Sequence, residues 1–591
     1  MKFLFFSLHA DLWGHAFPEA LVAETLAKAG HDIVYVGCGG SLDEFCVPMS
    51  AHGMTMHTPA AERGKVCAEC RKRDELIRSN FGLRGPHLSD LLDDEMRQET
   101  DRILAMTDRR SLIDLEVDGV AVGRAALYQL MLRRKRLDTD LTDDEFVEYL
   151  VELRHAVFAL LAGRKLIERE APDVVVVYNA LYSVNRVVCQ LAERRGIPQY
   201  FMHAGGNLSN RLQTLWIGRG DTFSFFPHLV RKWPEFAELP CSAADLRLIT
   251  EHFLELLRGR SAFVYSRPKS AGYADARAVF GVRPDQKLLV ATLGSYDEER
   301  AAEIVGARVH LKPPLFATQI EWVRSLADYV KTRRDLFLVL RVHPREFPNK
   351  REGVLSHHAR QLQETFSDLP ANVAVNWPDQ AISMYDLADQ TDVFLNSWSS
   401  VGKEMALLGI PVVLYAPELA FYPADLGYWG TTLPDYFAAV DRALMDGWKF
   451  DRVRRAYRWY VFELARAAVD LGDRYPKRDG PRRSFRQRLV EQIDRRVLPG
   501  FEQTWDCATR GSASRSAEQI CALFESLSTT VIEIEPPDNQ HAGAEQAEEF
   551  ALRREMLKLA NALFPTREAQ TKSRLFQTLS RPSHAPESAS G

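Results

Sequence analysis

The amino-acid sequence predicts an α/β protein with two open parallel sheets. Two observations lead to this prediction. Short apolar runs recur along the chain with helical patterns between them, and the runs fall into two groups. One group ends near residue 205, and the other begins near Lys287. Because strands that alternate with helices imply right-handed βαβ crossovers, the chain is predicted to hold two Rossmann-like domains.

Composition places the chain among ordinary globular proteins. Hydrophobic residues make up 46% of its 591 residues and charged residues 26%, which excludes wholesale disorder and fibrous classes. The net charge of -5 argues against a protein built around nucleic-acid backbones, so no nucleic-acid partner is expected. His9 and Asp11 interrupt the apolar start of the chain, and no apolar run has the length of a membrane span. A cytoplasmic location is therefore expected.

The first group of strands defines the N-terminal half. Its apolar runs are flanked by helical patterns, as in the doubly covered strands of a parallel sheet. A long charged stretch of helical pattern, about 60–170, is expected to be an insertion in this half. The expected strands are Phe3–Ser7, Ile33–Val36, Asp173–Tyr178 and Gln199–His203, with helices near 17–27 and 184–194.

The second group of strands defines the C-terminal half, and helical patterns follow it. The expected strands are Leu288–Leu293, Leu336–Leu340, Val373–Asn376, Val393–Leu395 and Pro411–Tyr415. The expected domains are 1–265 with the insertion, 266–435, closing helices at 436–535, and a polar tail at 536–591 with a helix at Ala544–Leu563. The end of the tail, Ser580–Gly591, has a composition typical of disorder.

Polar residues just past strand ends are the first candidates for function, because ligands of open α/β sheets bind outside the carboxyl ends of the strands. Three places in the second half qualify. They are Gly294-Ser295, Arg341-Val-His343-Pro344, and Asn396-Ser397-Trp-Ser399-Ser400, with Glu404 one turn into the following helix.

Each place allows a functional and an ordinary interpretation. Functionally, glycine lets backbone N–H groups approach an anion, and hydroxyls at a helix start hold a phosphate. His343 hydrogen-bonds a phosphate oxygen and, as a catalytic residue, is placed to donate a proton as the leaving nucleotide gathers charge. A carboxylate at Glu404 is placed to bind ribose hydroxyls. The ordinary interpretation is a turn at Gly294, a loop histidine at His343, an N-cap at Ser399 or Ser400, and a first-turn acid at Glu404.

The order of the two halves and the closing helices resembles a GT-B glycosyltransferase, in which two Rossmann-like domains face a cleft. The motifs within residues 287–420, Arg341-Val-His343-Pro344 and Asn396-Ser-Trp-Ser-Ser400 with Glu404, resemble those of capsule and lipopolysaccharide biosynthesis transferases. They are similar in particular to the His-Pro and Ser-Ser motifs of enzymes that use CMP-sugars, the sialic-acid and Kdo transferases. Polyol-phosphate transferases that use CDP-glycerol carry a comparable His-Pro.

The resemblance implies roles for individual residues. His343 would contact the donor phosphate, Ser399 and Ser400 would hold it, and Glu404 would bind the ribose. Gly294, Ser295, Arg341 and Ser397 complete the expected donor site. The chain departs from the sialyltransferases in one respect, because their acidic base motif, Asp/Glu-Asp/Glu-Gly, is not evident in the N-terminal half.

The general base is expected in the first half. Asp11 is the first candidate and His15 the second, since both follow the first strand. Asp11 is equally placed to cap the following helix. Asn179, His203 and Asn207 follow later strands and are expected to line the acceptor site. Because no Asp-x-Asp motif stands at a strand end, no divalent metal is expected in catalysis.

Two further features allow alternative interpretations. Cys67 and Cys70, with Cys38 and Cys46, have a spacing open to a structural zinc site, but free thiols in the insertion are favoured, and no cofactor is expected. The basic clusters Arg133–Arg136 and Arg474–Arg488 are either solvated helix faces or patches that attract anionic lipid or glycan. The second interpretation implies peripheral contact with the inner membrane.

The sequence thus predicts transfer of a sugar from a nucleotide-sugar, a CMP-sugar being favoured, to a surface polysaccharide or glycolipid acceptor. The resemblance implies inversion at the sugar. Alternatives of similar fold are a CDP-polyol phosphotransferase and a nucleotide-sugar 2-epimerase. A non-catalytic scaffold in polysaccharide assembly is the alternative from another class.

Overall fold

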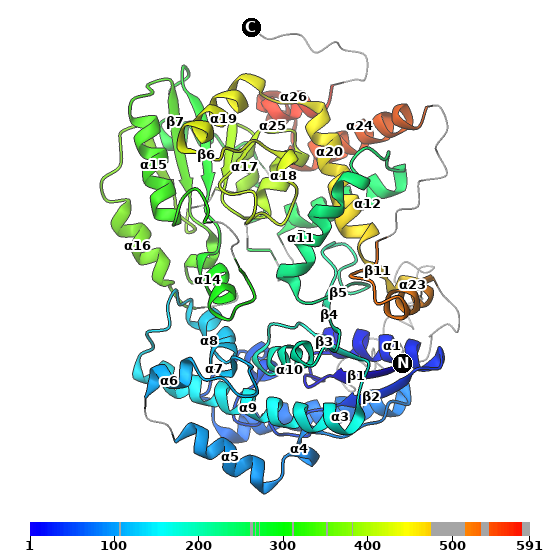
Figure 1. Cartoon of the computed structure of the whole chain (residues 1–591). Helices are drawn as coiled ribbons and strands as arrows, with labels where there is room; N and C mark the ends of the chain where they lie inside the picture. Colours follow the sequence, from blue (N-terminus) through cyan, green and yellow to red (C-terminus); the bar gives the residue numbers. More distant parts are fainter. Residues whose placement is uncertain are drawn as a thin grey trace, which may run out of the picture.

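The computed structural model contains two α/β domains, each built on its own sheet (Figure 1). It describes residues 1–105, 108–259, 264–265, 267–270, 272–309, 313–349, 353–380, 382–473, 515–532 and 543–581, and every structural statement below concerns these residues. The basic cluster Arg474–Arg488 and nearly all of the polar end after Ser580 lie outside them.

The first sheet has the strand order β11-β5-β4-β3-β1-β2. Its strands are β1 (Lys2–Phe6), β2 (Asp32–Val36), β3 (Val174–Tyr178), β4 (Gln199–Ala204), β5 (Thr214–Arg219) and β11 (Val469–Asp470). The four strands β1 to β4 pair in parallel, and β5 and β11 are antiparallel to their neighbours. Since β1 leads to β2 on one side and to β3 on the other, the switch point of this sheet lies between β1 and β3.

Helices cover the first sheet and form the insertion. Capping residues in the sequence set where helices begin. The capping box of Thr142 and Glu145, for example, starts α9, the longest helix among the described residues. The helices of this half are α1 (Trp13–Lys28), α2 (Val47–Ala51), α3 (Ala60–Phe81), α4 (Leu88–Leu91), α5 (Asp94–Leu104), α6 (Arg109–Ile113), α7 (Val122–Ala125), α8 (Leu127–Arg134), α9 (Asp143–Glu170), α10 (Ser183–Arg194), α11 (Thr222–Lys232) and α12 (Ala243–Arg258).

The second sheet is entirely parallel, with the order β10-β9-β6-β7-β8. Its strands are β6 (Lys287–Thr292), β7 (Leu336–Arg341), β8 (Val373–Asn376), β9 (Val393–Asn396) and β10 (Val412–Leu414). The chain runs from β6 outward through β7 and β8, then returns to β9 on the other side of β6. The switch point therefore lies between β6 and β9. The prediction of two Rossmann-like α/β domains is confirmed.

One helix precedes the second sheet, and further helices and a 3-10 turn follow its strands. They are α13 (Ala276–Phe280), α14 (Tyr296–Ile304), α15 (Gln319–Lys331), η2 (Pro344–Glu346), α16 (His357–Thr365), α17 (Met384–Ala388), α18 (Val401–Leu407) and α19 (Leu433–Asp446). The helices after β6 and β9, α14 and α18, start beside the switch point.

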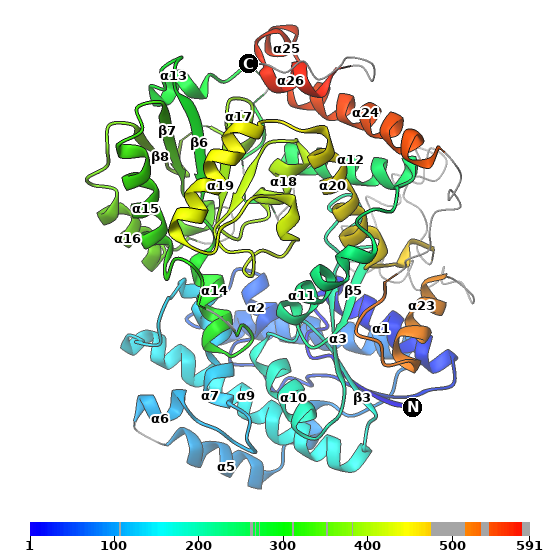
Figure 2. The ribbon, with the colours of Figure 1, turned by 45° about the horizontal axis from the view of Figure 1, so that its top comes forward.

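The closing segment returns to the first domain. After α20 (Phe450–Val461) and the π-helical turn η4 (Phe462–Arg466), β11 pairs with β5 of the first sheet. Figure 2 shows α23 (Arg515–Glu525) beside α1, and α24 (Ala544–Leu563) beside α12. The last helices are α25 (Arg567–Lys572) and α26 (Arg574–Leu579), and the hydroxyl of Ser573 donates to Asp389 of the second domain. The closing segment thus contacts both domains.

The basic cluster Arg133–Arg136 is neither a solvated face nor a free patch. Arg133 pairs with Glu152 at 2.8 Å, Arg134 with Glu148, and Arg136 with Asp138 and Glu145. Lys135 is fully buried. Because these cations are paired within the protein, the cluster does not supply the membrane-binding patch that the sequence suggested. No helix within the described ranges is long and apolar enough to cross a membrane.

Candidate active site

The loops after β6 and β9 touch each other at the switch point of the second sheet. Thr292 donates its hydroxyl to Asn396 Oδ1 at 2.8 Å, and the N–H of Ser397 donates to the carbonyl of Thr292 at 3.1 Å. A Cβ atom added at Gly294 would lie 2.6 Å from the Trp398 ring and 2.9 Å from Ser397 Oγ. Glycine is therefore required there, as the loops pack without space for a side chain.

Ser397 carries an unsatisfied hydroxyl at this point. The residue is fully buried, and its Oγ has no hydrogen-bond partner among the described residues. Gln319 at the start of α15 donates to the carbonyl of Gly294 at 3.3 Å, and its own buried Oε1 also lacks a partner. A buried polar atom without a partner is costly, so these two atoms mark a place where a polar ligand would be bound favourably. The Ser295 hydroxyl, in contrast, already donates a hydrogen bond to Asp297 Oδ1 at 3.2 Å.

His343 has a fixed tautomer. Its Nδ1 accepts the backbone N–H of Arg345 at 3.2 Å, so in the neutral ring the proton is on Nε2. Burial, helped by the nearby charge of Arg345, lowers the pKa of His343 to about 4. At neutral pH the half-buried ring is uncharged and presents Nε2–H as a hydrogen-bond donor, and this N–H has no partner among the described residues.

Two buried carboxyl groups support the His343 turn. Arg345 donates to Asp297 at 2.9 Å, and Glu346 accepts the backbone N–H of Tyr296 at 3.2 Å. Burial raises the pKa of Glu346 to about 7. The turn after β7 is thereby tied to the first residues of α14, which follow β6.

Arg341 does not reach the loops at the switch point. Its guanidinium is buried and donates to Asn376 at the end of β8 and to the carbonyl of Ile382 at 3.1 Å. Burial lowers the pKa of Arg341 to about 10. The structure gives this side chain a role in joining β7 to the loop after β8.

The two serines before α18 differ in their bonds. Ser399 accepts the N–H of Val401 in a long bond of 3.4 Å, and exposed Ser400 donates its hydroxyl to Glu404 at 3.1 Å. Asn396 holds the loop by donating to the carbonyl of Ser399 at 2.8 Å and to the hydroxyl of Tyr422 at 2.7 Å. This network keeps the turn before α18 in one shape.

Glu404 lies inside the domain rather than at its surface. It is 6% exposed, and its second oxygen accepts the hydroxyl of Tyr385 at 2.9 Å. Burial raises the pKa of Glu404. Since Ser400 and Tyr385 occupy both carboxyl oxygens, the carboxylate predicted to bind ribose is already paired in this structure.

The carboxyl edge of the first sheet carries a row of stacked rings. His15 stacks on Tyr178 with ring centres 4.0 Å apart, Tyr178 lies 6.0 Å from His203, and His203 lies 6.4 Å from Trp216. His9 meets Tyr182 edge-on at 5.3 Å. Burial lowers the pKa of His15 to about 3 and that of His203 to about 4. The structure thus brings two predicted residues, His15 and His203, into one neutral aromatic row.

Asp11 lies apart from this row. Its buried carboxylate is 2.6 Å from His52 Nε2 and 3.2 Å from an Arg73 nitrogen, and Arg73 also donates to the Asp11 carbonyl. These partners come from α3 and the end of α2. Asp11 is therefore held in an ion pair with the insertion, and it forms neither the helix cap nor a free carboxylate.

The two asparagines predicted for the acceptor site lie at strand ends. Asn179, directly after β3, has a φ of 61°, and its Oδ1 accepts the N–H of Leu181 at 3.0 Å. A non-glycine residue with positive φ is uncommon and often occurs at functional sites. Asn207 is fully buried, and its Nδ2 has no partner among the described residues.

Three residues that sequence analysis missed connect the two edges. Trp216 donates its indole N–H to the carbonyl of Glu463 at 3.2 Å, and the Glu463 carboxylate pairs with Lys403 of α18 at 2.5 Å. Lys403 lies within the quoted serine motif, so the motif itself was a signal for it. Trp216 is on β5 and Glu463 on η4, and the sequence indicated neither element as part of a site.

A further contact joins helices that follow strands of the two sheets. Arg186 of α10 donates to the carbonyl of Val305 at 3.0 Å, at the end of α14. The helix after β3 is therefore linked to the end of the helix after β6, and Trp216 of β5 is linked through Glu463 to the helix after β9.

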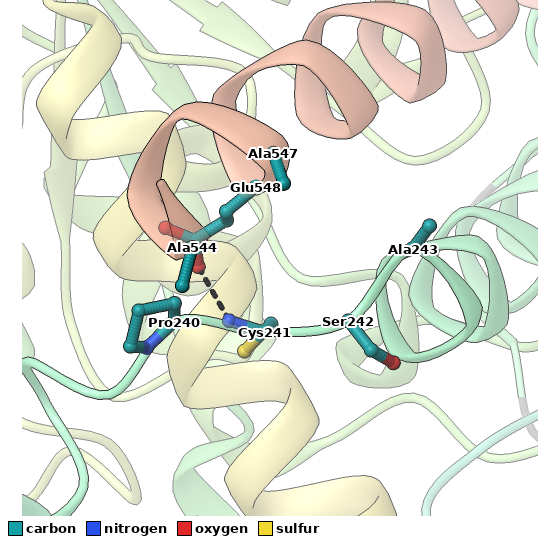
Figure 3. A pocket seen from close by; sticks show the side chains of 7 residues that line it. All are labelled: Pro240, Cys241, Ser242, Ala243, Ala544, Ala547 and Glu548. Carbon is teal, nitrogen blue, oxygen red and sulfur yellow. Dashed lines mark hydrogen bonds between the residues drawn. The ribbon is translucent and has the colours of Figure 1, made fainter. Parts of the chain in front are cut away.

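Two pockets lie elsewhere. A cavity of about 180 Å³ lies where the start of α12 meets the start of α24, and Glu548 accepts the Cys241 N–H inside it (Figure 3). Another, of about 390 Å³, is lined by residues around Gly119 and Gln190. No residue predicted for the donor or acceptor site lines either pocket.

The cysteines Cys38, Cys46, Cys67 and Cys70 are free thiols. Burial raises the pKa of Cys38 to about 11 and that of Cys70 to about 12. In the part of the chain that the structure describes, no group of three or more His, Cys, Asp or Glu side chains is arranged to hold a metal ion.

No protein-family model matches the chain, and no curated protein matches it. Among solved structures, the chain is similar to CalG4, the calicheamicin glycosyltransferase, at 17% identity over 84% of this chain and 99% of that one, with a TM-score of 0.25. It is similar to S. aureus MnaA with UDP at 12% identity, over 78% and 93% of the two chains, with a TM-score of 0.23. It is also similar to KpsC of Thermosulfurimonas dismutans, a beta Kdo 2,7 transferase, at 15% identity over 47% and 79%, with a TM-score of 0.25. The two-domain α/β fold is shown by the two sheets and their strand orders.

Proposed function

We propose that the protein is a glycosyltransferase that moves a sugar from a nucleotide-sugar to a glycan or glycolipid acceptor. The second domain binds the donor and the first domain binds the acceptor. One observation carries the proposal: three neighbouring strand ends of the second sheet offer groups that suit an anion. The loops after β6 and β9 hold the side-chain-free approach at Gly294 and the unsatisfied Ser397 hydroxyl, and the loop after the adjacent β7 presents the Nε2–H donor of His343. These features suit a phosphate group.

The chemistry required of the donor site is stabilisation of a leaving phosphate. As the bond from sugar to phosphate breaks, negative charge grows on the phosphate oxygens, and fixed donors stabilise it. Neutral His343 does this by hydrogen bonding, because its low pKa keeps the imidazolium form out of the neutral range. The hydroxyls of Ser397 and Ser399 are the other donors of the proposed site.

We further propose a CMP-sugar as the donor and a surface polysaccharide or glycolipid as the acceptor. The support is the resemblance of His343-Pro344 and Ser399-Ser400 to the motifs of CMP-sugar transferases. Glu404 is paired with Tyr385 and Ser400, so ribose binding by its carboxylate requires that the Ser400 bond be exchanged for a ribose hydroxyl. In the absence of donor, Glu404 therefore holds the hydroxyl of Ser400.

The test is nucleotide binding, measured by thermal shift with CMP, CDP, UDP and GDP. Selective stabilisation by CMP that His343→Ala loses, and that the control His57→Ala keeps, is the expected result. His57 is exposed and lies outside both strand-end clusters. Stabilisation by UDP or GDP instead would keep the transferase and discard the CMP donor. No stabilisation of the wild type by any nucleotide would favour the scaffold alternative.

Turnover then separates the enzymes of similar fold. Nucleotide release that an acceptor accelerates well above hydrolysis by water identifies a transferase, whereas a new nucleotide-sugar formed without acceptor identifies a 2-epimerase. Transfer of a polyol phosphate with release of CMP identifies the phosphotransferase.

A further inference from the structure

We infer that His203 is the general base of the transfer reaction and removes the proton of the acceptor hydroxyl through Nε2. The inference rests on the proposed function and deepens it, because it gives the acceptor side of the reaction to a residue that the sequence assigned only to binding.

The backbone determines which ring nitrogen of His203 carries the proton. Nδ1 lies 2.9 Å from the carbonyl oxygen of Ala204. A carbonyl oxygen only accepts, so Nδ1 is the protonated nitrogen, and the neutral ring presents the lone pair of Nε2. A histidine oriented in this way by its other nitrogen is the arrangement required of a base.

The neighbours hold this ring in place. His203 pairs with Trp216 across β4 and β5, and Tyr178 lies on its other side with ring planes 28° apart. The residue is half-buried, and its Nε2 has no partner among the described residues. The charged or titratable groups around it are Arg211, His15 and Tyr178, and the nearby charge of Arg211 contributes to the lowered pKa.

His203 and His343 have opposite tautomers. The Nδ1 of His343 accepts an N–H, whereas the Nδ1 of His203 donates to a carbonyl. His343 therefore donates from Nε2 and His203 accepts at Nε2. Each ring lies at the carboxyl edge of a different sheet. A displacement at the sugar needs a hydrogen-bond donor for the leaving phosphate and an acceptor for the proton of the attacking hydroxyl. His343 fits the first role and His203 the second.

The other candidates fit the role of base less well. The carboxylate of Asp11 is already paired with Arg73 and His52. The buried Nδ1 of His15 has no partner among the described residues, so nothing there fixes its tautomer. Of the three, His203 alone has a bond that orients its lone pair.

In the proposed step, His203 takes the proton of the acceptor hydroxyl while the sugar moves to the acceptor oxygen. The acceptor oxygen forms a bond to the anomeric carbon while the bond from that carbon to the phosphate oxygen breaks, and its electron pair leaves with the nucleotide. The acceptor proton moves to Nε2 of His203, and the imidazolium later releases it to water. The negative charge of the leaving nucleotide stabilises this imidazolium while both are present.

The first experiment is NMR of the wild-type protein labelled with ¹⁵N in the histidine rings, with His203→Asn and His343→Gln used to assign the signals. We expect a protonated Nδ1 and an unprotonated Nε2 for His203, and the reverse for His343. A His203 ring protonated on Nε2 would overturn the inference whatever the reaction is.

The second experiment measures nucleotide release from CMP-N-acetylneuraminic acid, UDP-N-acetylglucosamine and GDP-mannose, with water as acceptor. His203→Asn keeps an N–H for the Ala204 carbonyl and lacks Nε2. We expect its turnover to fall at least about 100-fold, the usual contribution of a general base, with nucleotide Kd and Tm unchanged. His57→Asn is the matched control. Wild-type turnover in His203→Asn overturns the assignment of the base alone, whereas failure of the wild type to bind any nucleotide overturns the proposed function.

Discussion

The ammonium of Lys403 lies 2.5 Å from the carboxylate of Glu463, and this ion pair joins the second domain to the closing segment beside the first sheet. Lys403 belongs to the helix after the Ser399-Ser400 turn, and Glu463 to the π-helical turn whose carbonyl accepts the Trp216 indole. The side chains are only 12% and 3% exposed. The Lys403–Glu463 pair thus connects the helix after the proposed phosphate-binding loop with Trp216, a member of the row of stacked rings on the first sheet.

Lys403→Met is expected to destabilise the protein by about 3–5 kcal/mol, because it leaves the Glu463 carboxylate buried without its partner. Chemical denaturation with the Tm as a second measure checks this value. Lys449→Met is the matched control, since Lys449 pairs with Asp446 at the surface and its loss should cost less than about 1 kcal/mol.

The double variant Lys403→Met with Glu463→Leu tests the cause. Replacing both charges removes the unpaired carboxylate, so most of the lost stability should return. If the double variant is as unstable as the single one, the contact of the Lys403 ammonium with the Tyr460 ring, 4.9 Å from the ring centre, and not the pairing with Glu463, holds this junction.

Lys135 is expected to position the turn that carries His343. Its fully buried ammonium donates to the carbonyls of Arg345, Phe347 and Val354, the last at 2.7 Å. Lys135→Met leaves these carbonyls without their donor, at a cost of about 1–3 kcal/mol for each buried group left unpaired. We expect a lower Tm and weaker nucleotide binding together, because the turn after His343 loses its support.

Lys165→Met is the control for this variant. Lys165 also donates to a backbone carbonyl, that of Leu91, but it is 41% exposed and lies away from the second domain. Its loss should leave nucleotide Kd unchanged. Equal nucleotide affinity in Lys135→Met and wild type would contradict a positioning role and leave Lys135 a purely structural residue.

The strands of both sheets were predictable where apolar residues run together. Val174 to Val177 are buried on both faces of the first sheet, and a buried run of this kind is readable from the sequence. Strand β5 was missed, because Gly218 interrupts a short segment, and one of its two partners, β11, comes from the distant closing segment. Such pairings depend on tertiary contacts that no local pattern contains.

The candidate site was predictable in position but not in detail. Strand ends identified His343 and His203 because the fold places ligands there. The tautomers of these rings depend on the N–H of Arg345 and the carbonyl of Ala204, which are set by backbone geometry. Likewise, the pairing of Asp11 with Arg73 could not be foreseen, since the helix that supplies Arg73 belongs to the insertion.

Gly402 is expected to tolerate no side chain. A Cβ atom there would overlap the Tyr422 hydroxyl and lie 2.6 Å from Asn396 Nδ2, the group that holds the serine turn. Gly402→Ala should destabilise the protein by about 1–3 kcal/mol, as overpacking does, and should weaken nucleotide binding. Thermal unfolding with and without CMP measures both effects.

Gly64→Ala is the matched change in α3. No atom lies within 4 Å of a Cβ added at Gly64, so the alanine should stabilise the helix by about 0.5–1 kcal/mol. Destabilisation of both variants to the same extent would argue against a specific contact at Gly402.

Glu19 is expected to make stability depend on pH. This buried residue of α1 accepts a hydrogen bond from Ser7, and burial raises its pKa from 4.5 to about 8. The folded state therefore keeps a proton that the unfolded chain has already lost between these two values. Its contribution is fully present below pH 4.5 and is lost as the pH rises to about 8, with a slope of at most about 1.4 kcal/mol per pH unit.

Glu19→Gln isolates this effect, because the amide keeps the shape and does not titrate. The difference in unfolding free energy between variant and wild type should shift in favour of the variant as the pH rises from 6.5 to 8.5. This pH window avoids the titration of His15 and His203. Their lowered pKa values make the wild type and the variant alike lose stability below pH 6.5. A difference that stays constant with pH would mean that Glu19 is ionised in the folded protein and that its proton is not held by burial.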